Sequence, residues 1–246
     1  MAASDAPDSP APVPVPVPVS NEAVARTYDA ASVAYDYLVA PLERPERLLG
    51  TVLLDLERGE RVCDLGCGPG HALPRFVDCV GEEGAVFGLD AAPGMLARAA
   101  RRVRRAGAAD RVTLLVGDAR RLPFADGSLD AVFLAETLEL FADPDAERAL
   151  AEIRRALGPD GRLCVTSMDL TGREDTAFVR GYEWAYRHVP GVDRLGCRPI
   201  PVAATLRRAG FRVDAVERGT RLGVWPTTVA LARPSTADTP ESGPGP

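Results

Sequence analysis

Three glycines follow an acid and a short apolar run in the stretch VCDLGCGPG, residues 62–70. Gly66, Gly68 and Gly70 remove side chains at three positions, which lets a ligand approach the backbone closely. A dinucleotide-binding loop needs the pattern G-x-G-x-x-G, whereas the third glycine here comes one position early. Asp64 precedes the loop, and a carboxylate there would repel a pyrophosphate but favour a cationic ligand. The loop therefore indicates a close-fitting, positively charged ligand.

Two further acids follow predicted strands downstream. Asp90 comes directly after AVFGL (85–89) and 20 residues after Gly70, where a carboxylate reaches ribose hydroxyls. Asp118 follows RVTLLV (111–116), where a carboxylate could accept a hydrogen bond from an exocyclic amine such as that of adenine. Either acid could instead cap a helix or a turn. Together with the loop, the acids indicate a ligand with adenine, ribose and a compact, partly cationic part.

The composition excludes several other chemistries. All 29 basic residues are arginine, so no lysine is available for a pyridoxal Schiff base or a P-loop. The two histidines, His71 and His188, are too few for a multi-histidine site, and we expect no metal. The five cysteines contain no C-x-x-C pair, which is typical of reduced structural thiols.

Charge and hydropathy limit the expected partners. A net charge of -6 disfavours nucleic acid, and the basic stretch RRVRR (101–105) fits the solvated face of a helix. No apolar run is long enough to span a membrane, and the N-terminus lacks the basic start of a secretion signal. We therefore expect a cytoplasmic chain with a small-molecule partner and no integral membrane segment. The oligomeric state does not follow from the sequence.

Strands and helices alternate along the chain, which is the pattern of a parallel sheet covered by helices on both faces. Five β-rich runs carry this pattern: RVCDL (61–65), AVFGL (85–89), RVTLLV (111–116), DAVFLA (130–135) and RLCVTS (162–167). Amphipathic helices are predicted to begin at Pro93 and after Pro144. The runs FRVDAVE (211–217) and VWPTTVALA (224–232) are too close for a parallel crossover. We expect an α/β, Rossmann-like, doubly wound and mostly parallel sheet with an antiparallel edge hairpin at its C-terminal end.

Proline-rich segments set the expected domain boundaries. Residues 1–19, which include PVPVPVPV, and residues 234–246 are expected to be disordered tails. Residues 20–60 are predicted to form an N-terminal helical cap. Residues 61–233 are predicted to form the ligand-binding domain, in which residues 169–200 cover a substrate.

Four motifs occur in an order that resembles the class I S-adenosylmethionine-dependent methyltransferases. They are VCDLGCGPG (62–70), GLDAAPGML (88–96), GDARRLPF (117–124) and LGPDGRLCV (157–165). Within that family the pattern is most similar to the ubiquinone/menaquinone-type group, which methylates small molecules, often quinol rings. The cofactor implied, S-adenosyl-L-methionine, has the adenine, ribose and cationic part that the acids indicate.

The resemblance also implies roles for the residues of the first two motifs. Gly66, Gly68 and Gly70 would let the backbone approach the methionine and ribose portion of the cofactor. Asp90 would bind the ribose, and Asp64 would order the loop.

Other positions would surround the adenine and the methyl group. Met95 would pack near the adenine, and Asp118 with the Ala119 amide would read the adenine edge. The Ala135 carbonyl or the Glu136 side chain would lie near the methionine end and the methyl group. Glu136 could instead only favour the positive end of a short helix.

A catalytic base is needed only if the acceptor carries a proton that it must lose. Glu136, His188 and a tyrosine are the candidates, and no partner in sequence supports any of them. His188 lies in the aromatic stretch GYEWAYRHVPG (181–191), which either packs on the sheet edge or covers a substrate.

The sequence therefore predicts a methyltransferase that acts on a quinol, phenolic, lipid-like or secondary-metabolite acceptor. A non-catalytic protein that binds S-adenosylmethionine for regulation or as a scaffold is the alternative. A nucleic-acid methyltransferase is disfavoured by the charge, and by AETLE (135–139) where an N-P-P-Y-type motif would stand.

Overall fold

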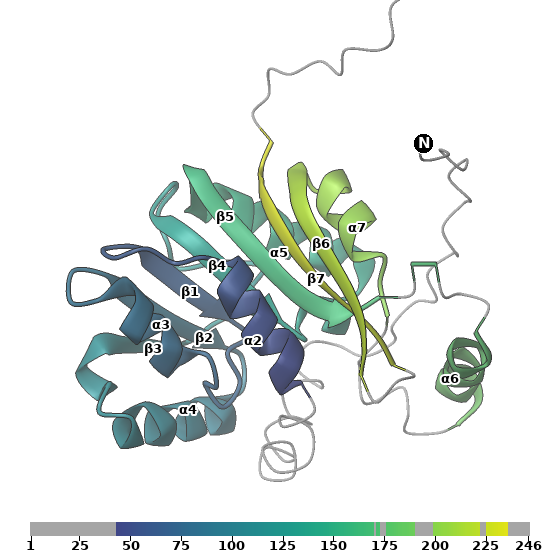
Figure 1. Ribbon diagram of the computed structural model, residues 1–246, viewed down its shortest axis with the longest axis horizontal. Helices are drawn as coiled ribbons and strands as arrows, with labels where there is room; N and C mark the ends of the chain where they lie inside the picture. Colours follow the sequence, from purple (N-terminus) through teal and green to yellow (C-terminus); the bar gives the residue numbers. More distant parts are fainter. Residues whose placement is uncertain (1–42, 170, 173–175, 190–198, 222–224, 236–246) are drawn as a thin grey trace, which may run out of the picture.

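A seven-stranded sheet forms the centre of the computed structural model, which describes residues 43–169, 171–172, 176–189, 199–221 and 225–235 (Figure 1). Its strands are β1 (Arg61–Leu65), β2 (Ala85–Asp90), β3 (Val112–Val116), β4 (Leu129–Ala135), β5 (Leu157–Met168), β6 (Phe211–Arg221) and β7 (Trp225–Pro234). Their order is β3-β2-β1-β4-β5-β7-β6. The first five strands are parallel, and β7 is antiparallel to both β5 and β6. The predicted doubly wound sheet with a C-terminal antiparallel hairpin is confirmed.

Helices connect most of the strands. They are α2 (Arg44–Leu53), α3 (Leu73–Val80), α4 (Pro93–Arg105), α5 (Asp143–Ala156), α6 (Ala177–His188) and α7 (Val202–Arg208), with the short 3-10 helices η1 (Ala109–Arg111) and η2 (Leu138–Leu140). α4 begins at Pro93 as predicted. α5 begins one residue before Pro144 and not after it. Proline is tolerated in the first turn of a helix, because an N–H at this position would have no carbonyl of the same helix to donate to.

Two apolar cores lie on opposite faces of the sheet because successive strand residues point to opposite sides. On β4, Val132 and Leu134 belong to the core under α5 and α7, whereas Ala131 and Phe133 belong to the core under α3 and α4. Phe76 of α3 meets Phe133 edge to face, with ring centroids 5.6 Å apart. The central strands are therefore buried on both sides, which explains their continuous apolar runs.

α2 crosses the face of the sheet that carries the α3 and α4 core (Figure 1). Gly50 allows this close approach, because a Cβ there would lie 2.8 Å from a ring carbon of Phe133 and 2.9 Å from Cγ2 of Thr166. α2 lies within residues 20–60, the predicted N-terminal cap, most of which falls outside the described residues. The predicted tail 1–19 and most of the predicted tail 234–246 also lie outside them.

The start of β5 differs from the prediction. The sequence predicts a turn followed by a strand over 162–167, whereas β5 begins at Leu157 opposite Leu129 and contains an irregularity before Arg162 pairs with Ala131. The irregularity accommodates Gly158 and Pro159, which disfavour regular pairing. The regular part of the strand begins where predicted.

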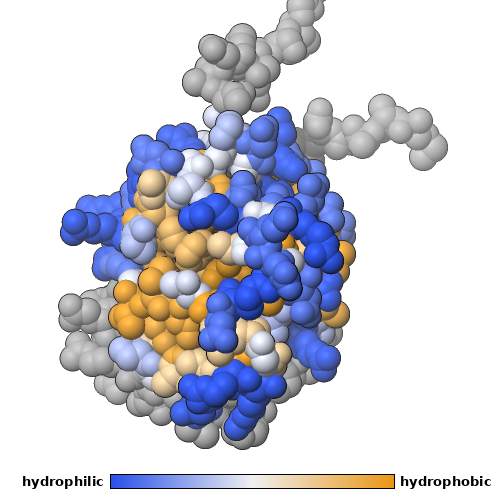
Figure 2. All heavy atoms as spheres, turned by 90° about the vertical axis from the view of Figure 1, so that its left-hand side faces the viewer, coloured by the Kyte–Doolittle hydropathy of each residue, from blue (hydrophilic) through white to orange (hydrophobic). Residues whose placement is uncertain are grey.

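One of the two edge strands of the sheet is β3. Figure 2 faces this side and shows an apolar area bordered by hydrophilic residues. Val116 at the end of β3 is 67% exposed.

None of the helices in the described part of the chain is long and apolar enough to cross a membrane.

Candidate functional site

The order in which strands are added to the sheet reverses between β1 and β4. β2 and β3 extend the sheet on one side of β1, and β4 and β5 extend it on the other. Ligands of open α/β sheets bind outside the carboxyl ends of the strands at such a point. Asp64, Asp90, Asp118 and Ala135 stand at the carboxyl ends of β1, β2, β3 and β4, so the structure brings these predicted residues to one edge.

The glycine loop is fastened to the end of β2. The backbone N–H groups of Gly66 and Cys67 both donate to the Leu89 carbonyl, at 2.7 and 3.0 Å. The Gly68 N–H donates to Oδ2 of Asp90 at 2.7 Å. These contacts fix the path of the loop beside Asp90.

The three glycines are needed for different reasons. All have positive φ angles, of 70, 50 and 73° for Gly66, Gly68 and Gly70, a region that other residues rarely adopt. A Cβ on Gly66 would collide with the Thr137 side chain, and a Cβ on Gly70 would lie 2.9 Å from Cβ of Ala99. A Cβ on Gly68 would meet no atom of the described residues within 4 Å. Gly68 therefore offers the open backbone surface that a closely held ligand requires, whereas Gly66 and Gly70 also serve packing within the protein.

Asp90 has a structural role as well as the predicted ribose-binding one. Its Oδ1 accepts from the Ala92 N–H at 2.8 Å, directly before α4, and its Oδ2 accepts from Gly68. A carboxylate offers about four acceptor positions, so these two backbone contacts do not by themselves rule out the predicted ribose-binding role. Met95 lies in the first turn of α4 and is buried, with 2% exposure.

Asp64 is buried at the end of β1, with 3% exposure. Burial raises the pKa of Asp64 to about 7, the Arg47 guanidinium on α2 opposes this rise, and the Asp90 carboxylate adds to it. This carboxyl group therefore titrates close to neutral pH.

The end of β3 carries an ion pair that the motif did not predict. Arg120 contacts Asp118 through its side chain, and these hydrogen bonds hold the pKa of Asp118 below its usual range. Asp118 is therefore an ionised acceptor, the form that an exocyclic amine needs. Ala119 is buried beside it.

Glu136 at the end of β4 belongs to a polar cluster that sequence reasoning missed. It has a φ of 48°, and its Oε1 accepts from Nη2 of Arg221 at 3.0 Å and from Oγ1 of Thr166 at 3.5 Å. The Nε of Arg221 lies 3.6 Å from Oε1 of Glu46 on α2. No motif marked Arg221 or Glu46, because both come from segments outside the four family motifs.

Glu139 is a second acid of this region, and it is 1% exposed. Its Oε2 accepts from Oγ of Ser167 at 2.6 Å, while its Oε1 has no hydrogen-bond partner among the described residues. Burial, with Glu136 nearby, raises the pKa of Glu139 well above its usual range. The protonated form of Glu139 is therefore favoured next to the Glu136–Arg221 pair.

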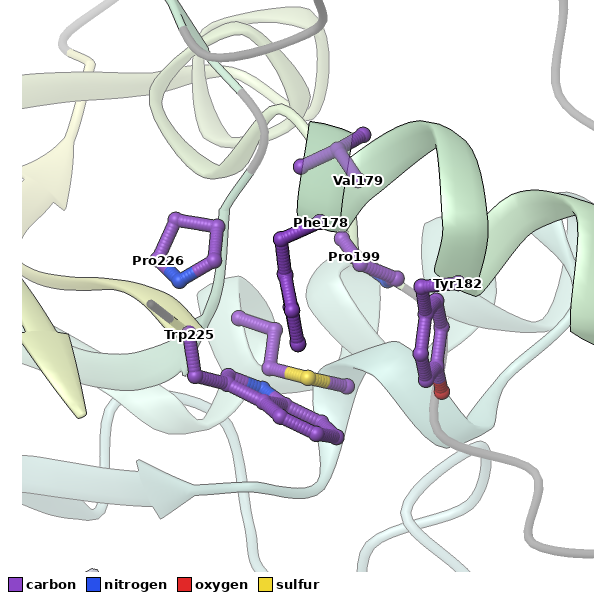
Figure 3. A pocket seen from close by; sticks show the side chains of 7 residues that line it. Phe178, Val179, Tyr182, Pro199, Trp225 and Pro226 are labelled. Carbon is purple, nitrogen blue, oxygen red and sulfur yellow. The ribbon is translucent and has the colours of Figure 1, made fainter. Parts of the chain in front are cut away.

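An apolar pocket lies between α6 and the start of β7 (Figure 3). It is a small, partly open cavity of about 10 Å³, and it is lined by Met168, Phe178, Val179, Tyr182, Pro199, Trp225 and Pro226. The rings of Phe178 and Tyr182 lie 5.3 and 5.4 Å from that of Trp225. Trp225 pairs with Arg221 across the β6–β7 hairpin, so the apolar pocket adjoins the polar cluster.

His188 is not brought to the other predicted residues. Its side chain is exposed at the end of α6, its Nδ1 lies 2.8 Å from the Trp184 carbonyl oxygen, and its ring stacks on that of Trp184. Tyr182 of the same helix packs on Trp225, so part of the aromatic stretch rests against the sheet edge. Residues 190–191 of that stretch lie outside the described residues.

Comparisons with known proteins agree with this geometry. A methyltransferase domain model matches residues 62–161. Demethylmenaquinone methyltransferase of Thermus thermophilus is 44% identical over 180 residues, which cover 65% of this chain and 78% of that protein. Aklanonic acid methyltransferase DauC of Streptomyces sp. is 35% identical over 147 residues, which cover 58% of this chain and 64% of that protein. The chain spans 46% of the length of two other Streptomyces relatives.

A solved structure shows the same fold. The 1,6-didemethyltoxoflavin-N1-methyltransferase of Burkholderia thailandensis superposes with a TM-score of 0.67 at 19% identity, over 92% of this chain and 94% of that one. The sheet order, the loop at the end of β1 and the Thermus relative agree with each other. The chain belongs to the class I S-adenosylmethionine-dependent methyltransferases, in the group that includes the demethylmenaquinone methyltransferases.

Proposed function

We propose that this chain binds S-adenosyl-L-methionine at the carboxyl ends of β1 to β4 and transfers its methyl group to a small-molecule acceptor. The open surface at Gly68, directly beside the Asp90 carboxylate, carries the proposal. A ligand held there lies against backbone and meets a group that only accepts hydrogen bonds. The residues present therefore fit an adenosyl group with a cationic sulfur.

The family resemblance suggests the cofactor-binding roles, and the position of these residues at the strand ends supports them. Asp90 accepts hydrogen bonds from the ribose, and Asp118 with the Ala119 amide reads the adenine. Met95 supports the adenine from α4. The Ala135 carbonyl, which accepts from Oγ1 of Thr137 at 2.8 Å, faces the methionine end of the site.

The chain contributes alignment more than covalent chemistry. S-adenosylmethionine supplies, when bound, a methyl group on a positively charged sulfur that is already activated for in-line displacement. Holding two reactants in line can lower a barrier by ~7–11 kcal/mol. The Glu136–Arg221 pair limits the charge near the methyl group, so that Glu136 does not present a lone carboxylate to the sulfonium.

The acceptor is proposed to be a small molecule with an apolar body. Its support is the apolar lining of the small cavity beside the polar cluster, together with relatives named for menaquinone and aklanonic acid. The net charge of -6 argues against nucleic acid. The cytoplasmic location expected from the sequence stays a prediction.

Calorimetry with S-adenosylhomocysteine and with NAD tests the cofactor assignment. We expect binding of S-adenosylhomocysteine and none of NAD, and tighter binding of NAD would overturn the assignment. A panel of quinol, phenolic and polyketide acceptors with methyl-labelled S-adenosylmethionine then tests transfer. Tight cofactor binding without transfer to any acceptor would favour the regulatory or scaffold alternative.

A further inference from the structure

Arg120 stands two residues after Asp118, in a part of the motif GDARRLPF to which the proposed function gives no task. Its guanidinium forms several hydrogen bonds with the Asp118 carboxylate. Nε lies 3.0 Å from both carboxylate oxygens, and Nη2 donates to Oδ2 at 2.6 Å. The Arg120 backbone N–H also donates to Oδ1 at 2.9 Å. The orientation of the carboxylate is thus set by four contacts from one residue.

The other end of the guanidinium is anchored on a helix. Nη1 of Arg120 donates to Oδ2 of Asp145 at 2.9 Å, and Asp145 lies in the first turn of α5. A carboxylate at this position is favoured by the helix dipole. Arg120 therefore connects a loop acid to a regular element packed on the sheet.

We propose that Arg120 is a positioning residue that holds the Asp118 carboxylate for recognition of the adenine amine of the cofactor. This inference rests on the proposed function. The planar fork of arginine fixes both position and rotation of a carboxylate, which a lysine cannot do. Without the guanidinium, Arg120 would hold Asp118 only through its backbone N–H on Oδ1, and Oδ2 would no longer be fixed toward the base.

Stability is not the whole account of the pair. The side chains of Arg120 and Asp118 are 30% and 45% exposed, so water screens their attraction and the contribution to folding is modest. Three N–H groups of Arg120 make the four contacts, because the Nε–H is shared between both oxygens, so one of about four acceptor positions of Asp118 is left for a ligand. The adenine amine can donate a hydrogen bond to this carboxylate. The carbonyl oxygen of hypoxanthine cannot, because it is an acceptor and would repel the carboxylate oxygen.

The test compares S-adenosylhomocysteine with S-inosylhomocysteine, in which the adenine amine is replaced by a carbonyl oxygen. Calorimetry on the full chain gives the ratio of the two dissociation constants. We expect wild type to bind S-adenosylhomocysteine at least about tenfold more tightly than S-inosylhomocysteine, because the inosine ligand loses one hydrogen bond to a charged group. Arg120→Gln should lower this ratio several-fold, and Arg120→Lys should restore it only in part.

Arg148→Gln is the matched control, because Arg148 contacts Asp145 at 3.5 Å, is 71% exposed and contacts no ligand residue named above. It should leave the ratio unchanged. Melting temperatures of both glutamine variants should stay within about 4 °C of wild type, as for any exposed pair.

The outcomes distinguish a wrong role for Arg120 from a wrong proposed function. An unchanged ratio in Arg120→Gln, or tighter binding of S-adenosylhomocysteine by that variant, would overturn the role of Arg120 alone. Wild type that binds both ligands equally would overturn the adenine assignment of Asp118 and this inference with it. Wild type that binds neither ligand would overturn the proposed function itself.

Discussion

Gly68 differs from its two neighbours in the loop because its missing side chain faces open space and not protein. Gly68→Ala should therefore weaken binding of S-adenosylhomocysteine tenfold or more, since a methyl group would occupy the ligand's surface. Gly59→Ala is the matched control. Gly59 has a φ of 87°, and a Cβ there also meets no atom of the described residues within 4 Å.

Both alanine variants carry a similar backbone strain of about 1 kcal/mol, so both should lose a few degrees of melting temperature. Only Gly68→Ala should lose affinity in calorimetry. Equal affinity in the two variants would mean that the ligand does not lie against Gly68.

Asp64 makes stability depend on pH. An unfolded aspartate titrates near ~3.9, while folding raises the pKa of Asp64 to about 7. Between these values the folded chain keeps a proton that the unfolded chain releases. The free energy of unfolding should therefore fall as pH rises from 4 to 7, by on the order of 4 kcal/mol, and should show no further loss from Asp64 above pH 7.

Asp64→Asn should remove the part of this decline that Asp64 contributes, because an amide has no proton to release, while the buried Glu139 carboxyl, whose pKa is also raised, keeps its own contribution. Urea denaturation of both proteins at several pH values measures it. Asp110→Asn, at an exposed carboxyl, should leave the wild-type slope intact. Parallel curves for wild type and Asp64→Asn would contradict the assignment of the slope to Asp64.

At the scale of elements, Arg221 joins the β6–β7 hairpin to the end of β4. Arg221 and Glu136 are 11% and 10% exposed, so Arg221→Met leaves a buried carboxylate without its cation. Loss of one partner of such a pair costs about 3–5 kcal/mol, whereas loss of both is far milder. We expect Arg221→Met to be strongly destabilised and Glu136→Gln with Arg221→Met to recover part of the loss, since Glu46 still lacks its arginine.

Arg212→Met provides the comparison on the same strand. Its pair with Asp214 is exposed, with 70% exposure at Arg212, and should be worth at most about 1 kcal/mol. The free energies of unfolding of wild type, Arg221→Met, Glu136→Gln and the double variant give the coupling energy. Additive effects of the Arg221 and Glu136 substitutions would show that the two side chains do not interact in solution.

Elements could be predicted where local signals agree. The stripe Met95, Leu96, Ala99 and Val103 recurs at helical spacing after a proline, and these are the buried residues of α4. The start of β5 could not be placed, because Gly158 and Pro159 suggest a turn while pairing with β4 extends the strand past them.

At the scale of the whole molecule, the order of the motifs along the chain was enough to predict that the acids lie at one edge of the sheet. Parallel strands present their carboxyl ends at one edge, so acids that follow those strands must meet there. Contacts between distant segments were not predictable. Arg221 and Glu136 are 85 residues apart, and Arg120 and Asp145 are 25 apart, with no periodicity that connects them.

The family resemblance was equally limited. It predicted residues around a shared cofactor, and the structure brings those at the strand ends to one edge of the sheet. It gave no guide to Glu139, Glu46 or the pocket beside Trp225, because these lie outside the four family motifs. His188 was selected for its residue type alone, and the structure leaves it on the outside of α6.

The loop of three glycines is held by the Leu89 carbonyl, by the Asp90 carboxylate and by its own bond from the Gly70 N–H to the Cys67 carbonyl. Glycine is the residue that loses most freedom when its backbone is ordered. Here that entropy is lost during folding, so a ligand meets a preorganised surface and association need not await loop closure. Association with S-adenosylhomocysteine should then be a single fast phase in stopped-flow mixing, with a rate that rises linearly with ligand concentration.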